Sequence, residues 1–432
     1  MKALTLYIRL CLGLWVLVSS VANAADNTLE KAVMGTAQDQ QLQNLFQTAL
    51  NQNPSIQYAL AMQSSALSEQ KMMASLQGVE VRYKGDLSYA SMQNSSFTRS
   101  GHRLEASYPL YEPDTNDLVS AASFRHEASK HQVEEIKQGL YLDISKQYYR
   151  YWSQQAELEY LQKELQSITD IKMQLKQRFK VGYQDINDIS YIQARLDTNQ
   201  ADLLKSKQAL QVTRVNMEAL VGRGIEWKLL KAPQHLPPMI KNPQDQSSWQ
   251  AHINEHPVLK RLGQSELAAN SQIEYAKSRD GIMVSAYGAY INNQSDGNFY
   301  DDMQGVKAGI QLNVPIYLGD KTNSAIGKAR ADNQQLKALK RQKQLMLTAS
   351  VKIAYMSVQS GLEQLKALKA ALESNKQAVK AAEKGLTTGN RNILNLLDAQ
   401  INRHKAEKEI QVIKNSIWQN WYLYRWSQGK TS

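Results

Sequence analysis

Two short stretches decide the fold, because each interrupts a long helical pattern at a glycine. The first, KVGYQDINDI, covers residues 180–189, and the second, TGNRNILNLLD, covers residues 388–398. Glycine adopts the backbone conformations that end a helix, so we expect helix breaks at Gly182 and Gly389. Each break would join two long helices into a hairpin with a polar end. Two such hairpins in one chain favour a tube with a closable end over an enzyme pocket.

The placement of proline supports hairpins of unusual length. No proline occurs between Pro113 and Pro233, and none follows Pro315. Because a proline inside a helix costs about 3 kcal/mol or more, these intervals can hold very long helices. A helix of about 65 residues measures roughly 100 Å at 1.5 Å per residue. That length exceeds what a globular core requires.

The chain is internally duplicated, with matching positions 203 to 207 residues apart. Asn53-Pro54 matches His256-Pro257, and the two glycine breaks match each other. Four prolines between 233 and 243 mark a linker between the halves. We therefore expect five segments: a signal peptide (1–24), a first repeat (25–222), a proline-rich linker (223–250), a second repeat (251–426) and a tail (427–432).

Both halves change their hydrophobic period in the same order, from a helix to two strands and then to the long hairpin. Residues 306–316 alternate between apolar and polar, which indicates a strand with one apolar face. The predicted fold is mixed α and β and mostly α. The expected helices before the strands are 40–77 and 257–279, and the expected strands are 79–92, 102–110, 282–292 and 306–316.

The N-terminus has the form of a secretory signal peptide. Lys2 and Arg9 precede or flank a short apolar run at 10–18, and Ala22-Asn23-Ala24 resembles a cleavage site. The run is too short to span a bilayer as a helix. We expect cleavage after residue 24 and export from the cytoplasm, with an uncleaved anchor as the alternative.

Cysteine content excludes several kinds of chemistry. The only cysteine, Cys11, lies in the predicted signal peptide. The cleaved chain would have no disulfide, no thiol nucleophile, no cysteine ligand for a metal and no cysteine to carry an N-terminal lipid.

The net charge of +11 would become +9 once Lys2 and Arg9 are removed. Nucleic acid is not an expected partner of an exported protein. Lysine and arginine are spread along the helical segments, which is typical of solvated helix faces. Contact with anionic lipid headgroups is the second interpretation.

Competing motifs are weak. The stretch His252–His256 has the spacing of an H-x-x-E-H zinc motif, but it precedes a helix expected to start at Pro257, so its histidines would not share a helical turn. No phosphate-binding loop or nucleophile elbow is present in the sequence, and we expect no metal, no cofactor and no catalytic residue. Aromatic residues at 418–426 fit either helix packing or a belt at a membrane surface.

Four strands with one apolar face allow two interpretations. They either belong to a soluble sheet, or they cross a membrane in a barrel that closes between chains, because open sheet edges are not stable in lipid. No apolar run after the signal is long enough for a membrane helix.

The order of these features resembles the TolC-type outer-membrane channel family. The resemblance rests on the repeated pattern of helix, strand pair, long helix, glycine break and long helix. It rests also on Tyr-Pro-Leu-Tyr at 108–111 and Val-Pro-Ile-Tyr at 314–317, and on the two tip sequences. It covers nearly the whole cleaved chain.

This resemblance implies a homotrimer in the outer membrane of a Gram-negative bacterium. Twelve strands would form a transmembrane β-barrel held in outer-membrane lipid, and twelve helices would form a periplasmic α-barrel with a closed end. A periplasmic adaptor and an inner-membrane pump, either an ABC transporter or a proton-driven pump, would dock there. The channel would be passive.

The resemblance also implies a gate at the hairpin ends. In the family, an arginine and an aspartate on neighbouring hairpins hold the aperture shut, and here they map to Arg391 and Asp188, with Asn187 beside it. The narrowest point maps to Asn395 and Asp398, so one of two carboxylate rings is missing. The alternative is that these side chains form an incidental exposed pair worth about 0–1 kcal/mol.

Two roles remain open within the channel interpretation, namely type I protein secretion and efflux of small molecules. Two other classes compete with it. A periplasmic coiled-coil adaptor would have a single hairpin between other domains, and a secreted structural coiled coil would not need strand pairs.

Overall fold

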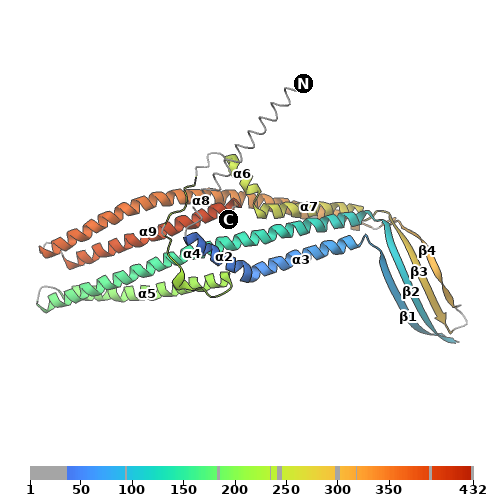
Figure 1. Cartoon of the computed structure of the whole chain (residues 1–432), viewed down its shortest axis with the longest axis horizontal. Coiled ribbons are helices and arrows are strands. Elements are labelled where there is room, and N and C mark those ends of the chain that lie inside the picture. Colours follow the sequence, from blue (N-terminus) through green and yellow to red (C-terminus); the bar gives the residue numbers. More distant parts are fainter. Residues whose placement is uncertain are drawn as a thin grey trace, which may run out of the picture. The chain divides into compact units, whose positions relative to one another are not determined.

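A computed structural model describes residues 37–92, 95–181, 185–233, 235–240, 246–296, 302–317, 319–388 and 392–429. The elements follow the repeated order expected from the sequence (Figure 1). They are α2 (Ala37–Gln52), α3 (Pro54–Ser75), β1 (Glu80–Met92), β2 (Ser95–Tyr111), α4 (Pro113–Lys180), α5 (Ile186–Val221), the 3-10 turn η1 (Trp227–Leu229), α6 (Gln246–Asn254), α7 (Pro257–Ser278), β3 (Met283–Ser295), β4 (Met303–Asn313), α8 (Lys321–Thr387) and α9 (Ile393–Ser427).

The chain forms two compact units. One contains the described residues up to Ile56, Lys137–His252 and those from Leu347 on, and the other contains Gln57–Ile136 and Ile253–Met346. The long helices α4, of 68 residues, and α8, of 67 residues, contribute to both units. No helix in the described part of the chain is long and apolar enough to cross a membrane.

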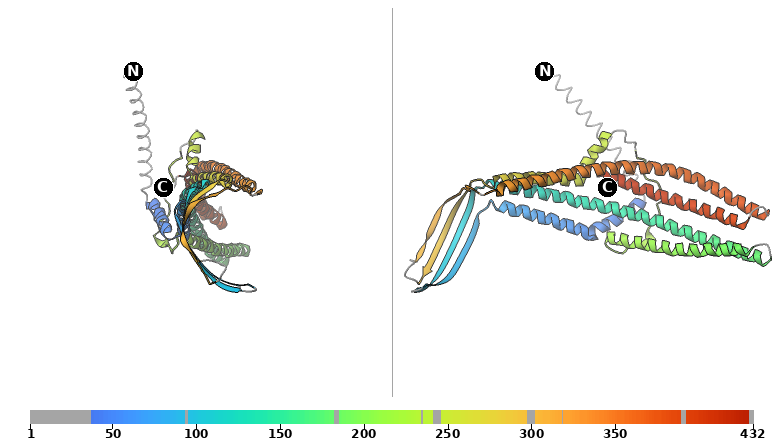
Figure 2. Two further views of the ribbon diagram at one scale, coloured as in Figure 1. Left: turned by 90° about the vertical axis from the view of Figure 1, so that its right-hand side faces the viewer. Right: turned by 180° about the vertical axis from the view of Figure 1, so that it is seen from behind.

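The second unit holds a four-stranded antiparallel sheet with strand order β1-β2-β3-β4 (Figure 2). Each repeat supplies one pair, and β2 pairs with β3 between the repeats. In that central pair His102 faces Asn292, and the register shifts between Pro109 and Tyr111. Proline lacks the N–H that a ladder needs, so an irregularity at this end of the strand is expected.

The sheet exposes an apolar face. On β1, the alternate residues Val81, Tyr83, Leu87 and Tyr89 are exposed, and on β4 Val306, Ile310 and Leu312 are exposed. Alternate residues of a strand share one face. A contiguous exposed apolar face of this kind marks an interaction surface.

The prediction of one helix over 40–77 is wrong, because the helix is broken between α2 and α3. Asn53 lies between them and caps α3, since its Oδ1 accepts a hydrogen bond from Ser55 N (2.8 Å) and its Nδ2 donates to Leu220 O (2.7 Å). The residue before a proline is disfavoured in the α region, so Pro54 can begin a helix but does not continue α2. His256 has the matching role before Pro257, where its Nδ1 accepts from Val258 N.

The strands also differ from expectation at their ends. β2 begins at Ser95 rather than 102, and β4 ends at Asn313 rather than 316. Residues at 314–316 continue the alternating pattern, but Pro315 has no N–H to donate to β3.

Aromatic side chains join α4 to α9 in the first unit. Tyr149 and Trp418 stack, Tyr422 packs beside both, and all three are buried. The interpretation of this aromatic segment as helix packing is confirmed for Trp418 and Tyr422.

Candidate gate at the ends of the helical hairpins

The ends of both hairpins share one apolar core, here called the tip core. It contains buried residues from α4, α5, α8 and α9, so each of the four long helices contributes to it. Leu386 packs against this core and is half-buried. The tip core consists of Ile168, Ile171, Leu175, Ile192, Val379, Ala382, Ile393, Leu396, Leu397 and Ile401.

Capping residues fix where each returning helix begins. Asp185 is the N-cap of α5 and accepts a hydrogen bond from Asn187 N (3.0 Å). Asn392 is the N-cap of α9 and accepts from Leu394 N (3.3 Å). Side-chain oxygens at this position satisfy an N–H that has no partner within the helix. The two repeats thus use the same device, with a carboxylate in one and an amide in the other.

Two predicted gate residues lie in the first turn of α5. The Nδ2 of Asn187 donates to Asp185 Oδ2 at 3.1 Å, so this amide contacts the cap of its own helix. Asp188 is half-buried, and its negative charge is favourable at the N-terminus of a helix.

Asp398, the predicted carboxylate of the narrow point, forms an ion pair within the chain. Arg195 Nη1 donates to Asp398 Oδ1 at 2.7 Å. Arg195 lies on α5 and Asp398 on α9, so the pair joins the two hairpins beside the tip core. Asn395 lies one turn before Asp398, is exposed, and donates its backbone N–H to Asn392 O at 3.0 Å.

The surroundings of Arg195 favour its charged form. Partial burial acts to lower the pKa of Arg195, but the hydrogen bond to Asp398 and attraction to Tyr191, Asp398 and Glu164 outweigh burial and raise it. The guanidinium lies 5.6 Å from the centre of the Tyr191 ring, one turn earlier on α5. The guanidinium of Arg195 therefore contacts both Asp398 and the ring of Tyr191. The sequence alone did not indicate Arg195 as a site residue.

Gly182, Gly389 and Arg391 lie outside the described residues. The pairing of Arg391 with Asp188 stays a prediction. The described helices α4 and α8 end at Lys180 and Thr387, and α5 and α9 begin at Ile186 and Ile393, on either side of the expected breaks.

A second polar cluster joins α4 to α9 farther from the hairpin ends. Lys408 Nζ lies 3.0 Å from Glu157 Oε2 and 4.8 Å from the centre of the Tyr160 ring. Lys163 and His404 both approach Glu407, at 3.5 Å each. All of these residues except Glu157 border an open cleft of about 250 Å³.

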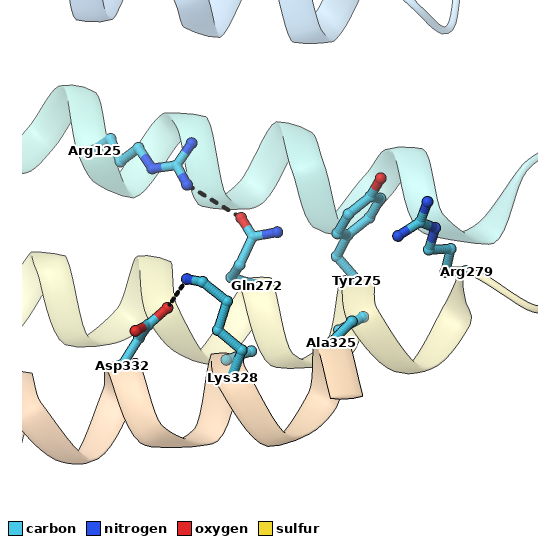
Figure 3. A pocket seen from close by; sticks show the side chains of 9 residues that line it. Arg125, Gln272, Tyr275, Arg279, Ala325, Lys328 and Asp332 are labelled. Atoms are coloured by element: carbon cyan, nitrogen blue, oxygen red, sulfur yellow. Dashed lines mark hydrogen bonds and ion pairs between the residues drawn. The ribbon is translucent and has the colours of Figure 1, made fainter. Parts of the chain in front are cut away.

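A groove of about 360 Å³ in the second unit is lined by α4, α7 and α8 (Figure 3). Arg125 donates to Gln272 at 3.1 Å, and Lys328 pairs with Asp332 along α8. Tyr275 and Arg279 line its other part. No group of three or more His, Cys, Asp or Glu residues able to hold a metal is found among the described residues, including the H-x-x-E-H stretch.

The sequence pattern of the family described as outer membrane efflux protein matches residues 45–223 and 250–422. The chain belongs to this family. The match covers more than half of the chain and falls in two segments, one in each repeat.

Relatives of known name support this assignment. The chain is 25% identical over 328 residues to the outer membrane protein TolC of Vibrio cholerae, which covers 71% of each protein. It is 24% identical to TolC of Escherichia coli K12 over 63% of this chain and 58% of that one. It is 22% identical to the proteases secretion protein PrtF of Dickeya chrysanthemi over 56% of this chain and 54% of that one.

Solved structures show the same fold. A CusC structure superposes with a TM-score of 0.79 at 16% identity and covers 90% of this chain and 92% of that one. The outer membrane protein VceC of Vibrio cholerae gives a TM-score of 0.78 at 15% identity, with 90% and 96% covered. Channels of this kind have an α-barrel and a β-barrel.

The chain is therefore an outer-membrane exit duct for secretion or efflux, and not an enzyme. Channels of this family work with adaptors and inner-membrane pumps, and trimeric assembly is known for the family. The family is found in the outer membrane of Gram-negative bacteria.

Proposed function

We propose that three copies of this chain assemble into a duct whose periplasmic mouth is closed by the hairpin ends. The observation that carries this proposal is the tip core, in which four helices of one chain converge while Asn395 and Asp398 stay exposed beside it. The apolar core holds the four helices together, and the two exposed polar residues lie at its surface, where a passage or a neighbouring copy could contact them.

Exposed apolar side chains on α5 and α8 support assembly from identical subunits. In the first unit α4 and α9 lie in the middle, since they contact each other through Lys163 and Glu407, and α5 and α8 lie on either side of them (Figure 1). Val215 on α5 is 53% exposed and Met356 on α8 is 60% exposed. A contact between α5 of one copy and α8 of the next would cover both, and a ring closes such head-to-tail contacts.

A pair of engineered cysteines tests this contact. Val215 is the thirtieth residue of α5, and Met356 is the thirty-second from the end of α8, so both lie at similar distances from the hairpin ends. With Val215→Cys and Met356→Cys in one chain, mild oxidation should give covalent dimers and trimers. The single variants should give neither covalent dimers nor covalent trimers by this contact, because Cys11 is the only native cysteine. A double variant that stays monomeric under oxidation would contradict the α5–α8 contact.

The sheet supports a lipid contact in the same assembly. Four strands per chain give twelve in a trimer, and closure between chains would leave no free sheet edge. The exposed apolar residues of β1 and β4 would face outer-membrane lipid. The proposal expects heat-modifiable trimers in the outer-membrane fraction, with the long helices in the periplasm.

At the mouth, Asp188 and Arg391 are proposed to hold the aperture shut, with Asn187 beside them. Asn395 and Asp398 are proposed to line the narrowest point, and Gly182 and Gly389 to form the hairpin turns. Three symmetry copies multiply a modest energy per pair. The proposed segments are the signal peptide at 1–24, the repeats at 25–222 and 251–426, the linker at 223–250 and the tail at 427–432.

The cargo is proposed to reach the duct from an inner-membrane pump through a periplasmic adaptor. The names of the relatives point to both cargo classes, since PrtF is named for secretion of proteases and the family for efflux. Deletion of the gene separates them. Loss of a secreted protein from the medium would indicate type I secretion, and increased sensitivity to small toxic compounds would indicate efflux.

A further inference from the structure

We propose that Arg195 determines the charge selectivity of the duct mouth, because it neutralises the Asp398 carboxylate at the proposed narrow point. This inference rests on the proposed function. It assigns a role to a residue of α5 that neither the gate motif nor the tip sequences contain.

The geometry makes Arg195 the counter-ion of Asp398. The two side chains come from different repeats, and their atoms Nη1 and Oδ1 lie 2.7 Å apart. Arg195 is 30% exposed and Asp398 is 54% exposed, so both reach water from the edge of the tip core. Tyr191 supports the guanidinium from its own helix, at 5.6 Å from the ring centre.

Three residues of each chain contribute to the net charge at the proposed narrow point. Asn395 carries no charge, Asp398 carries one negative charge, and Arg195 carries one positive charge. The set is therefore neutral in each chain, and three chains place no net charge from it at the mouth. A ring of three unpaired carboxylates would attract cations, because charged rings at a constriction select ions by sign.

A stabilising role alone does not account for the pair. Exposed ion pairs contribute little to stability, even when their geometry is good. The field of an unpaired charge at a narrow aqueous passage is felt by a passing ion, because low-dielectric walls concentrate it. Ion selectivity is therefore the property that removal of Arg195 should change most.

Reversal potentials in planar bilayers test the inference on the full-length purified protein. Under a salt gradient of potassium chloride, Arg195→Gln should raise the cation-over-anion permeability ratio by about two- to fourfold, because it exposes three carboxylates. Asp398→Asn should lower the ratio, because it leaves three guanidinium groups unpaired. The double variant should return close to the unaltered channel.

Two further variants control for charge and for folding. Lys207→Gln removes the same charge from an exposed position of α5 farther from the tip, and should leave the ratio unchanged. Arg195→Lys keeps the charge and should preserve the ratio. If Arg195→Gln does not assemble, the sign of the preference in Asp398→Asn decides. A channel that prefers anions supports the inference, because unpaired guanidinium groups then remain, and a channel without preference overturns it.

The possible failures are distinct. Conducting channels whose ratio is the same in Arg195→Gln and the unaltered protein would overturn the role of Arg195 alone. An equal shift in Lys207→Gln would also overturn it, because the effect would then come from overall charge. If the unaltered protein formed no channel, both the proposed duct and this inference would be overturned.

Discussion

The ring of Tyr149 stacks on the ring of Trp418, with centroids 5.7 Å apart and planes inclined by 6°. Tyr149 lies on α4 and Trp418 on α9, so the stack joins the first repeat to the second. Trp418 Nε1 also donates to His235 O at 2.8 Å, which attaches the segment between the repeats to α9. One buried side chain thus holds three parts of the chain.

Replacement of Trp418 by alanine should destabilise the first unit strongly. Loss of a large buried aromatic side chain costs about 3–5 kcal/mol. The midpoint of denaturant unfolding, followed by the helical circular dichroism signal, should fall accordingly. Met239→Ala is the control, because Met239 is 81% exposed and its loss should change stability by less than about 0.5 kcal/mol. Equal midpoints for the two variants would contradict the role of the stack.

Gly222 should not tolerate alanine, whereas Gly224 should. Gly222 ends α5 with φ 85°, and a Cβ there would lie 3.0 Å from the backbone C and O atoms of Gln52. The left-handed conformation alone costs a non-glycine residue about 1–2 kcal/mol. A Cβ at Gly224 would meet nothing within 4 Å. The difference in unfolding free energy between the two variants should therefore exceed about 1 kcal/mol, and similar values would argue against this crowding.

His404 should make the protein less stable in mild acid. Burial and nearby Arg403 lower its pKa from the usual 6.5, with Lys163 adding to this and Glu407 opposing it. Between the folded pKa and 6.5, only the unfolded chain takes up the proton, so stability falls as the pH falls through this window. His404→Gln should reduce the loss of thermal stability between about pH 7.5 and about pH 5.5.

Glu407→Gln is a matched variant that tests the direction of this change of stability with pH. Glu407 favours the protonated imidazole, so its removal should lower the pKa of His404 further and increase the loss of stability in acid. A His404→Gln variant whose stability depends on pH as in the unaltered protein would exclude His404 as the source.

Replacement of Arg391 by serine should loosen the closed mouth. Three Arg391–Asp188 pairs of about 0–1 kcal/mol each can shift the balance between closed and open states by up to about 3 kcal/mol. We expect a higher resting conductance in planar bilayers and greater entry of bulky antibiotics into cells. Lys207→Gln is the charge control. A variant with the same resting conductance and the same antibiotic entry as the unaltered channel would count against the gate.

The sequence was sufficient for the fold wherever a periodic pattern is long. The repeat order and the long hairpins could be predicted, because proline-free helical patterns and alternating strands leave few other arrangements. The single helix expected over 40–77 failed at Asn53, where the apolar pattern continues but the chain breaks. Pro54 disfavours the α conformation at Asn53, and the side chain of Asn53 then donates a hydrogen bond to Leu220 O, which is remote in sequence.

The same limit applies to the candidate site. Asp398 could be proposed from the sequence because it belongs to a tip motif, whereas Arg195 lies outside both tips and is 203 residues away from its partner. Only the convergence of the four long helices in the tip core brings the two together. A search for opposite charges at similar distances from the two hairpin ends could have found the pair.

The ladder between β2 and β3 has a consequence for the origin of the chain. It joins the strand pair of one repeat to that of the other, edge to edge and antiparallel, as two separate molecules would be joined. A half-length ancestor could have formed this contact between identical copies, with twice as many subunits in the same ring. In this chain the contact lies within one subunit, and the two halves differ, since one carries Arg195 and the other Asp398.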